Sequence, residues 1–211
     1  MKRGFLVLTI ASAALAAGTA FADGMVGNTQ FLIGQTFLSD DWKPLDEPTS
    51  FGVEVDFAPA KSPVHVALGF DVAGESKRVS GPVFGQSGKV GAGILEFSAG
   101  AAWHPVKKGV VRPYIGVGVV RVFAGVGSGS DFWSGGESDQ SFGFYGNAGV
   151  FFKVGDTFNI GFDGRTVRGT NISLANFDTN TNYGQASLLL GFSWGQSHDQ
   201  PPTSGSASEA P

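Results

Sequence analysis

The sequence lacks cysteine altogether, which excludes disulfide bonds and thiolate metal sites. Beyond the first 22 residues it also lacks any apolar run of about 20 residues, the length that a transmembrane helix needs. Charged residues make up only 15% of the chain, the formal net charge is -4, and there is no basic block. These absences argue against a disulfide-rich secreted module, a helical membrane protein and a nucleic-acid-binding domain.

The first 22 residues have the order of features that marks a signal peptide. Positive charge at residues 1–3 precedes a short apolar run at residues 5–17, and residues 20–22 (Ala-Phe-Ala) fit the small-x-small cleavage pattern. The apolar run is shorter than the roughly 20 residues of a membrane anchor. We therefore expect residues 1–22 to be removed and Asp23 to begin the mature chain. An exported chain without cysteine favours a bacterial envelope over a eukaryotic secreted module.

Strict alternation of apolar and polar residues is the main signal in the rest of the chain. It is clearest in residues 51–73, where two alternating runs flank a break that contains Pro59 and Pro63. A period of two predicts β-strands, and two such runs across a short break predict a hairpin. The 33 glycines and 19 phenylalanines of the chain are interleaved in such runs. This mixture suits a barrel in which small side chains face a crowded lumen.

The pattern recurs and predicts eight strands. They are expected at residues 29–38, 51–58, 64–73, 90–104, 112–123, 141–154, 158–167 and 182–194. Long connections at residues 39–49, 74–89, 124–140 and 169–181 alternate with short connections at 59–63, 105–109 and 155–156. Outer-membrane barrels have this alternation of long outside loops and short periplasmic turns, whereas a soluble sandwich gives no reason for it. The sequence therefore predicts an all-β fold, an eight-stranded antiparallel up-and-down transmembrane β-barrel over residues 23–195, with a disordered periplasmic tail at 196–211.

The cost of burying charge in lipid decides which face of each strand points inward. A basic residue on the lipid face costs about 2–4 kcal/mol at the bilayer midplane, so the charged face should line the lumen. The expected polar network of the lumen consists of Glu54, Asp56, His65, Asp71, Glu96, Arg112, Asp163 and Arg165. The expected lipid-facing set includes Phe51, Val53, Val55, Phe57, Val66, Leu68, Phe70, Phe97, Trp103, Phe192 and Trp194. For residues 112–123 we prefer Ile115, Val117 and Val119 outward, with Arg121 near the outer interface.

Aromatic residues gather near the strand ends, as in the interfacial belts of membrane proteins. The periplasmic belt would contain Phe57, Trp103, Phe152, Phe158, Phe192 and Trp194. The outer belt would contain Phe37, Phe51, Phe70, Phe142 and Tyr183. A soluble barrel also has one apolar face, so the membrane prediction depends on the belts together with the signal peptide and the alternating connections.

No catalytic constellation is found. An eight-stranded barrel is just filled by its side chains, so we expect the charged lumen residues to form a structural ion-pair plug rather than a gated pathway. Outer-membrane lipid A deacylases carry an Arg-x-x-His-x-Ser-Asn run, and the nearest match is residues 165–171. There Arg168 occupies the position of the base and Thr170 that of the nucleophile. An arginine side chain stays protonated and cannot serve as a general base.

We predict neither a metal nor a cofactor. Acidic residues crowd the first long connection at Asp40, Asp41, Asp46 and Glu47, but they lack the spacing of an EF-hand and suit a solvated loop better. His65 and His104 are expected within strands, and His198 in the tail. The basic residues Lys77, Arg78 and Lys89 are candidates for contact with lipopolysaccharide phosphates.

Two stretches resemble a known family. The run at residues 112–118 (Arg-Pro-Tyr-Ile-Gly-Val-Gly) and the last strand, which ends Gly191-Phe192-Ser193-Trp194, are similar to phrases of small outer-membrane β-barrel proteins. These proteins belong to the OmpA-like and opacity-type porin superfamily, and the resemblance covers about residues 27–194. It implies an outer-membrane barrel whose last strand is read by the barrel-assembly machinery. Many members stop at the closing aromatic residue, whereas here a tail follows.

The resemblance does not fix an activity, because the family includes adhesins, structural anchors and members of unknown role. We expect a non-enzymatic integral protein of the outer membrane of a Gram-negative bacterium, with extracellular loops and a structural or surface-interaction role. Its expected partners are outer-membrane lipids, lipopolysaccharide and the barrel-assembly machinery. The alternatives are a lipid A-modifying enzyme, a narrow porin for small solutes and a soluble periplasmic lipocalin-like binder.

Overall fold

The computed structural model describes residues 24–79, 88–106, 109–128, 137–174 and 177–195. The expected signal peptide at 1–22 and the expected tail at 196–211 lie outside the described residues and stay predictions.

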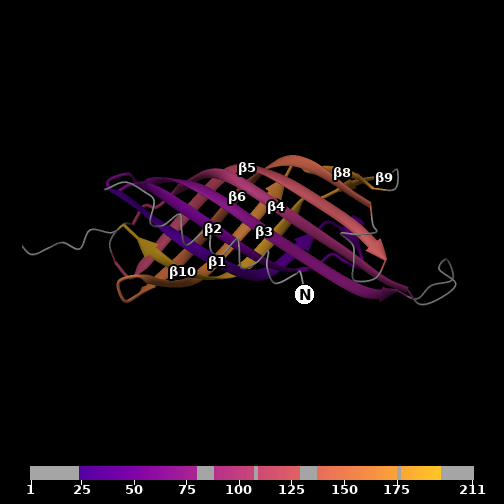
Figure 1. The fold of residues 1–211 in the computed structure, drawn as a ribbon, viewed down its shortest axis with the longest axis horizontal. Helices are drawn as coiled ribbons and strands as arrows, with labels where there is room; N and C mark the ends of the chain where they lie inside the picture. The colour runs from indigo at the N-terminus through magenta and orange to yellow at the C-terminus, as the bar shows by residue number, and fades with distance from the viewer. Residues whose placement is uncertain (1–23, 80–87, 107–108, 129–136, 175–176, 196–211) are drawn as a thin grey trace, which may run out of the picture.

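Eight antiparallel strands close into an elongated barrel with steeply tilted strands (Figure 1). Consecutive strands of the barrel pair with one another, and the last strand pairs with the first from Gly27 opposite Trp194 to Leu38 opposite Tyr183. This confirms the eight-stranded antiparallel up-and-down barrel predicted from the alternating pattern. The barrel strands are β1 (Met25–Leu38), β2 (Thr49–Pro59), β3 (Val64–Val79), β4 (Gly88–Trp103), β5 (Val111–Ser128), β6 (Glu137–Val154), β7 (Phe158–Arg168) and β10 (Tyr183–Trp194).

The two ends of the barrel carry different connections. The short-turn end has the tight turns at residues 60–63 and 155–157, and Gly155 occupies the second of these with a φ of 69°, a conformation that favours glycine. The long-loop end has the connections at 39–48 and 169–182. The first contains the short 3-10 helix η1 (Asp40–Trp42), and the second contains a small hairpin of β8 (Asn171–Leu174) and β9 (Phe177–Asn180). Figure 1 shows this hairpin at the same end of the barrel as the extended wall strands.

Several strands extend farther than the alternating pattern predicted. β3 and β4 stay paired out to Val79 and Gly88, and β5 and β6 stay paired out to Val126 and Glu137. Parts of the expected loops 74–89 and 124–140 are therefore strand. These segments are rich in glycine and polar residues, and beyond Ala124 and Val126 they add few apolar side chains, so they give a weak strand signal. The backbone hydrogen bonds of the ladder hold them instead.

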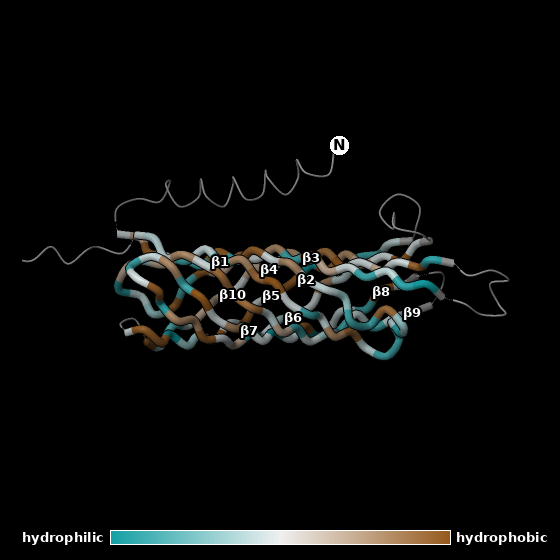
Figure 2. Tube along the Cα trace, turned by 90° about the horizontal axis from the view of Figure 1, so that it is seen from below, coloured by the Kyte–Doolittle hydropathy of each residue, from teal (hydrophilic) through white to brown (hydrophobic). Residues whose placement is uncertain are grey.

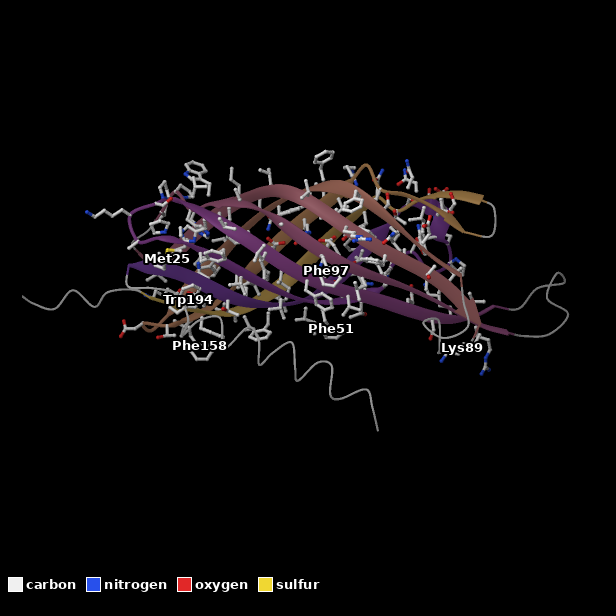
Figure 3. All side chains as sticks on the ribbon, turned by 45° about the horizontal axis from the view of Figure 1, so that its top comes forward. Met25, Phe51, Lys89, Phe97, Phe158 and Trp194 are labelled. Atoms are coloured by element: carbon white, nitrogen blue, oxygen red, sulfur yellow. The ribbon has the colours of Figure 1, made fainter. Side chains whose placement is uncertain are left out.

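The apolar faces of the strands point away from the barrel interior. Phe51, Leu68 and Phe97 are 53%, 48% and 50% exposed, and Ile115, Val117 and Val119 also lie on this outer wall. Figure 3 shows Phe51 and Phe158 projecting from the wall. Hydrophobic residues recur along the wall, while the end that carries β8 and β9 is largely hydrophilic (Figure 2). No helix in the described part of the chain has the length and hydropathy needed to cross a membrane.

Candidate functional site

The barrel interior is the candidate site, because inward side chains of all eight strands meet there. Its charged members alternate with the outward apolar residues along each strand, as a period of two requires. The charged residues that the structure buries, among those it describes, are Glu54, Asp56, His65, Asp71, Glu96, His104, Asp163 and Arg165. They come from β2, β3, β4 and β7, with His104 just after β4, so the strand register brings together residues that lie far apart in the sequence.

A central ion-pair cluster surrounds Arg165 on β7. Its Nη2 pairs with Glu96 Oε1, and its Nη1 lies 3.7 Å from Glu54 Oε2. The guanidinium also lies over the ring of Tyr145, 4.0 Å from the ring centroid. The Tyr183 hydroxyl donates a hydrogen bond to the second oxygen of Glu96. Two carboxylates, a cation and two aromatic rings thus fill the middle of the lumen, where unpaired charge would be costly.

The remaining acids of the middle layer accept hydrogen bonds from neutral side chains. The Tyr114 hydroxyl donates to Asp163 Oδ2 over 2.6 Å, and Asn147 Nδ2 donates to the same oxygen over 3.2 Å. Gln185 Nε2 lies 3.4 Å from Asp71 Oδ1 on the opposite wall. Hydroxyl and amide donors therefore anchor acids that Arg165 does not contact.

Glycine gives the interior tyrosines their space. Gly149 lies directly opposite Tyr114, and a Cβ added there would come within 2.6 Å of the tyrosine ring. Gly118 lies opposite Tyr145, and a Cβ there would come within 2.5 Å of that ring. Each tyrosine ring therefore lies over a glycine of the neighbouring strand, where the Cβ of any other residue would collide with the ring. This is the close packing that the mixture of glycine and aromatic residues suggested.

An apolar plug fills the interior towards the long-loop end. Besides the rings of Tyr145 and Tyr183, its large members come from the wall strands and from both connections: Trp42, Leu45, Ile94, Val120, Val122, Val167 and Ile172. Trp42 is held by a 2.9 Å hydrogen bond from its Nε1 to the carbonyl of Asn180, and Ser39 Oγ donates to the same carbonyl over 2.8 Å. The first connection, expected as a polar loop, is therefore joined to the β8–β9 hairpin above the lumen. Trp42 and Leu45, two large apolar residues in an otherwise polar loop, are the sequence feature that could have predicted this contact.

An acid–histidine layer lies at the short-turn end. It consists of Asp56 on β2, His65 on β3 and His104 just after β4, all buried. His65 Nδ1 lies 2.5 Å and His104 Nε2 lies 3.4 Å from Asp56 Oδ1, and the two imidazole centroids are 4.4 Å apart. The sequence placed Asp56 and His65 in the lumen network but left His104 out of it.

Two residues lie elsewhere than the sequence suggested. Arg112 does not join the central ion-pair cluster: it is half-buried near the short-turn end, where its Nε donates to the carbonyl of Gly109 over 3.2 Å. It is the second residue of β5, so it is too near the end of the barrel to reach the acids. Tyr183 was expected in the outer aromatic belt but is only 3% exposed and points inward, because it shares the phase of Gln185 and Ser187 on β10.

The deacylase-like run does not assemble a catalytic site within the described residues. Arg168 donates through Nη1 to the backbone carbonyls of Val167 and Tyr183. Thr170 is buried, and its hydroxyl lies 3.3 Å from Asn182 Oδ1. The histidines of the acid–histidine layer lie at the opposite end of the barrel. The side chain beside the Thr170 hydroxyl is therefore an amide, which is not a general base.

The acidic residues of the first connection are engaged in local contacts. Asp40 Oδ1 and Lys43 Nζ form an exposed ion pair at 2.6 Å. The hydrogen bond from Lys43, helped by its charge, lowers the pKa of the Asp40 carboxyl, and the same contact raises the pKa of Lys43. Asp40 is therefore paired with Lys43 in this solvated loop.

Comparison with known proteins gives similarity in structure alone. No family model matches the sequence, and no curated protein does. Among solved structures, OprG of Pseudomonas aeruginosa has a TM-score of 0.55 at 14% identity, covering 82% of this chain and 96% of that one. The attachment invasion locus protein Ail of Yersinia pestis has a TM-score of 0.53 at 15% identity, covering 82% and 100%. Neisserial surface protein A has a TM-score of 0.53 at 14% identity, covering 81% and 97%.

These proteins are small outer-membrane β-barrels, and their similarity to this chain extends over nearly the whole of each. Identities near 15% establish the fold and leave the activity open. The resemblance expected from the two sequence stretches is thus confirmed at the level of the fold: the chain has the same eight-stranded barrel fold as these small outer-membrane proteins.

Proposed function

We propose that this protein is a non-enzymatic integral protein of the outer membrane, exported by its signal peptide, with a structural or surface-interaction role. The observation that carries this proposal is a filled interior inside an apolar outer wall. Such a barrel has a surface suited to lipid and an interior that serves to hold the wall together. The similarity in fold to OprG, Ail and Neisserial surface protein A supports the location.

The filled interior argues against a porin. The central ion-pair cluster, the Tyr114 ring and the apolar plug occupy successive levels of a barrel whose eight strands leave room for little else. A solute would have to displace Arg165 from its carboxylates and Trp42 from its hydrogen bond. We therefore expect the barrel to give no steady conductance.

Fractionation and planar-bilayer recording test this proposal together. The protein should resist extraction by salt and carbonate, dissolve in detergent, show heat-modifiable mobility on gels and give no steady current in a planar bilayer. Release without detergent would identify a soluble periplasmic binder instead. A stable open level would identify a porin. A changed acyl pattern of lipid A in cells that carry the gene, measured by mass spectrometry, would identify an enzyme.

The surface-interaction part of the proposal is supported by a pair of like charges beyond the apolar wall. Arg78 on β3 lies directly opposite Lys89 on β4, and both side chains are exposed. Figure 3 shows Lys89 at the far end of this extension. Two cations facing each other across a ladder repel, so this position is suited to an anionic partner such as the phosphates of lipopolysaccharide.

Binding to lipopolysaccharide tests this contact. Replacing both residues, Arg78→Ser with Lys89→Ser, should weaken the salt-sensitive binding of the detergent-solubilised barrel to purified lipopolysaccharide. Lys61→Ser, at the opposite end of the barrel, is the matched control and should bind as the parent does. Equal binding by the double variant and the parent would reject this partner.

A further inference from the structure

The acid–histidine layer has a composition that the structural role of the lumen does not require. Two imidazoles and one carboxylate meet at the short-turn end, and their potential ligand atoms all lie within 4.8 Å of one another. Asp56, His65 and His104 are 1%, 7% and 5% exposed. A single Asp–His pair would satisfy the charge of Asp56, so the second histidine calls for another explanation.

His104 carries an unused ligand atom into this layer. Its Nε2 has no hydrogen-bond partner although it is buried, and its 3.4 Å separation from Asp56 Oδ1 lacks hydrogen-bond geometry. The ring is held in place by stacking on Tyr114, with centroids 5.7 Å apart, and by Phe151 at 5.9 Å. A buried, unpartnered nitrogen is costly, and it is held rigidly towards the other two groups.

Neighbouring amides orient the carboxylate towards the histidines. Asn28 Nδ2 donates to both oxygens of Asp56, over 2.9 and 3.2 Å, and Gln30 Nε2 donates to Oδ2 over 3.1 Å. The two amides of β1 therefore fix the carboxylate, with Oδ2 accepting from both of them and Oδ1, which accepts from Asn28 alone, also facing His65 and His104. Metal-binding carboxylates are held by the same kind of outer hydrogen bonds.

We propose that Asp56, His65 and His104 form a binding site for one divalent transition-metal cation, with zinc as the test ion. The ligand atoms are Asp56 Oδ1, His65 Nδ1 and His104 Nε2. Two imidazole nitrogens and one carboxylate oxygen suit Zn²⁺, Co²⁺, Ni²⁺ or Cu²⁺, whereas Ca²⁺ and Mg²⁺ prefer oxygen ligands alone.

One of the ligand separations already has the value that a tetrahedral ion needs, and the other ligand atoms lie within reach of the same ion. Ligand bonds of 2.0–2.1 Å place neighbouring ligand atoms about 3.4 Å apart. The distance between His104 Nε2 and Asp56 Oδ1 already has this value, at 3.4 Å. His65 Nδ1 lies closer to Oδ1, at 2.5 Å, so the ion replaces the proton of this hydrogen bond, which is released to solvent, and the two atoms move apart as each bonds to the ion. Three protein ligands leave the fourth position to water.

Zinc titration of the refolded, tag-free chain tests the site. The full chain from Asp23 to Pro211 is treated with a chelator, folded in detergent and titrated calorimetrically with ZnCl₂. In a parallel sample, ZnCl₂ is added before folding, and the zinc bound to the folded barrel is then measured. One ion per barrel is expected. His104→Phe keeps the ring stacking on Tyr114 and should lower the affinity at least about 100-fold, the upper end of the cost of losing an outer partner. Asn28→Ala should lower the affinity about 10–100-fold by releasing Asp56.

His198 provides the matched control, since it is the one histidine outside the acid–histidine layer in the sequence and is not among the described residues. His198→Ala should bind zinc as the parent does. Binding that survives His104→Phe, that is lost in His198→Ala, or that is absent from the parent would overturn the site. Heat-modifiable mobility on gels shows whether His104→Phe folds. If it does not fold, the site is tested with Asp56→Asn and the visible absorption of bound Co²⁺: the parent should show the bands of a four-coordinate ion, and the variant should not.

Discussion

At the scale of single residues, Arg165 is the side chain on which the interior depends most. It is the buried cation that faces Glu54 and Glu96 within the described lumen, and its guanidinium also covers Tyr145. A buried pair adds little stability when compared with an apolar replacement of both partners, but removal of one partner leaves the other charge unpaired in a dry interior. The cost of losing Arg165 should therefore be much larger than the value of the pair itself.

Arg165→Met should destabilise the folded barrel by about 3–5 kcal/mol, because Glu54 and Glu96 would lose their cation. Urea unfolding in detergent or in lipid vesicles, followed by tryptophan fluorescence, measures this difference. Arg112→Met is the control, since within the described residues Arg112 donates to a backbone carbonyl near the short-turn end, and it should change stability by less than about 0.5 kcal/mol. Adding Glu96→Gln to Arg165→Met should recover part of the loss, and equal losses for both arginines would contradict the cluster.

The interior glycines make a second prediction at this scale. Gly149→Ala would place a Cβ within 2.6 Å of the Tyr114 ring, which would have to move away from its hydrogen bond to Asp163. Overpacking of this kind costs about 1–3 kcal/mol. Gly164→Ala is the matched control: its Cβ would point outward, with the nearest atom at 3.8 Å, and should be nearly neutral. If both substitutions have the same effect in the same unfolding assay, Tyr114 does not need the space that Gly149 leaves.

At the scale of the elements, the outer face of each strand should respond to charge according to its depth. Leu68, in the middle of the outer face of β3, lies between the levels of Phe51 and Phe57 on the neighbouring β2 and is 48% exposed. Val111, at the beginning of β5, is 51% exposed but lies at the short-turn end. The two positions have similar exposure in the isolated chain, so a surrounding bilayer would be the main difference between them.

Leu68→Lys should make folding into vesicles less favourable by about 2–4 kcal/mol, whereas Val111→Lys should make it less favourable by about 0–1 kcal/mol. The difference arises because lysine at the midplane has to leave water, while lysine at the rim reaches the interface. Urea-dependent folding into vesicles of short-chain lipid measures both. A soluble barrel would accept lysine equally well at the two positions, so equal values would reject the membrane placement.

The connections show what alternation cannot predict. Trp42 and Ile172 are buried in the apolar plug although their segments have no period of two, because their positions depend on contacts between two loops. The extensions of β3 and β6 were missed for a related reason: glycine and polar residues pair through their backbones and leave no mark on the side-chain pattern. Predicting which loop residues are buried therefore requires the structure of the barrel that the loops cover.

At the scale of the whole molecule, the number, order and facing of the strands follow from the sequence because one period of two governs them all. The same period predicted that Asp56, His65 and Arg165 share one interior. It could not say which of them meet, since that depends on the register between strands and on the tilt that places His104 beside His65 across the end of β4. Alternation therefore gives the composition of the lumen, and the paired register gives its chemistry.

The pairing of β1 with β10 has a consequence for how such a chain can reach its final state. This seam joins Gly27 to Trp194, the largest sequence separation of any strand pair, and so it requires the greatest loss of chain entropy. Until it forms, both strands expose a row of unpaired backbone groups, which hydrocarbon cannot satisfy. Stepwise insertion of single hairpins is therefore disfavoured. Closure and insertion should occur as one cooperative event, with the earliest and the latest segments of the barrel meeting last.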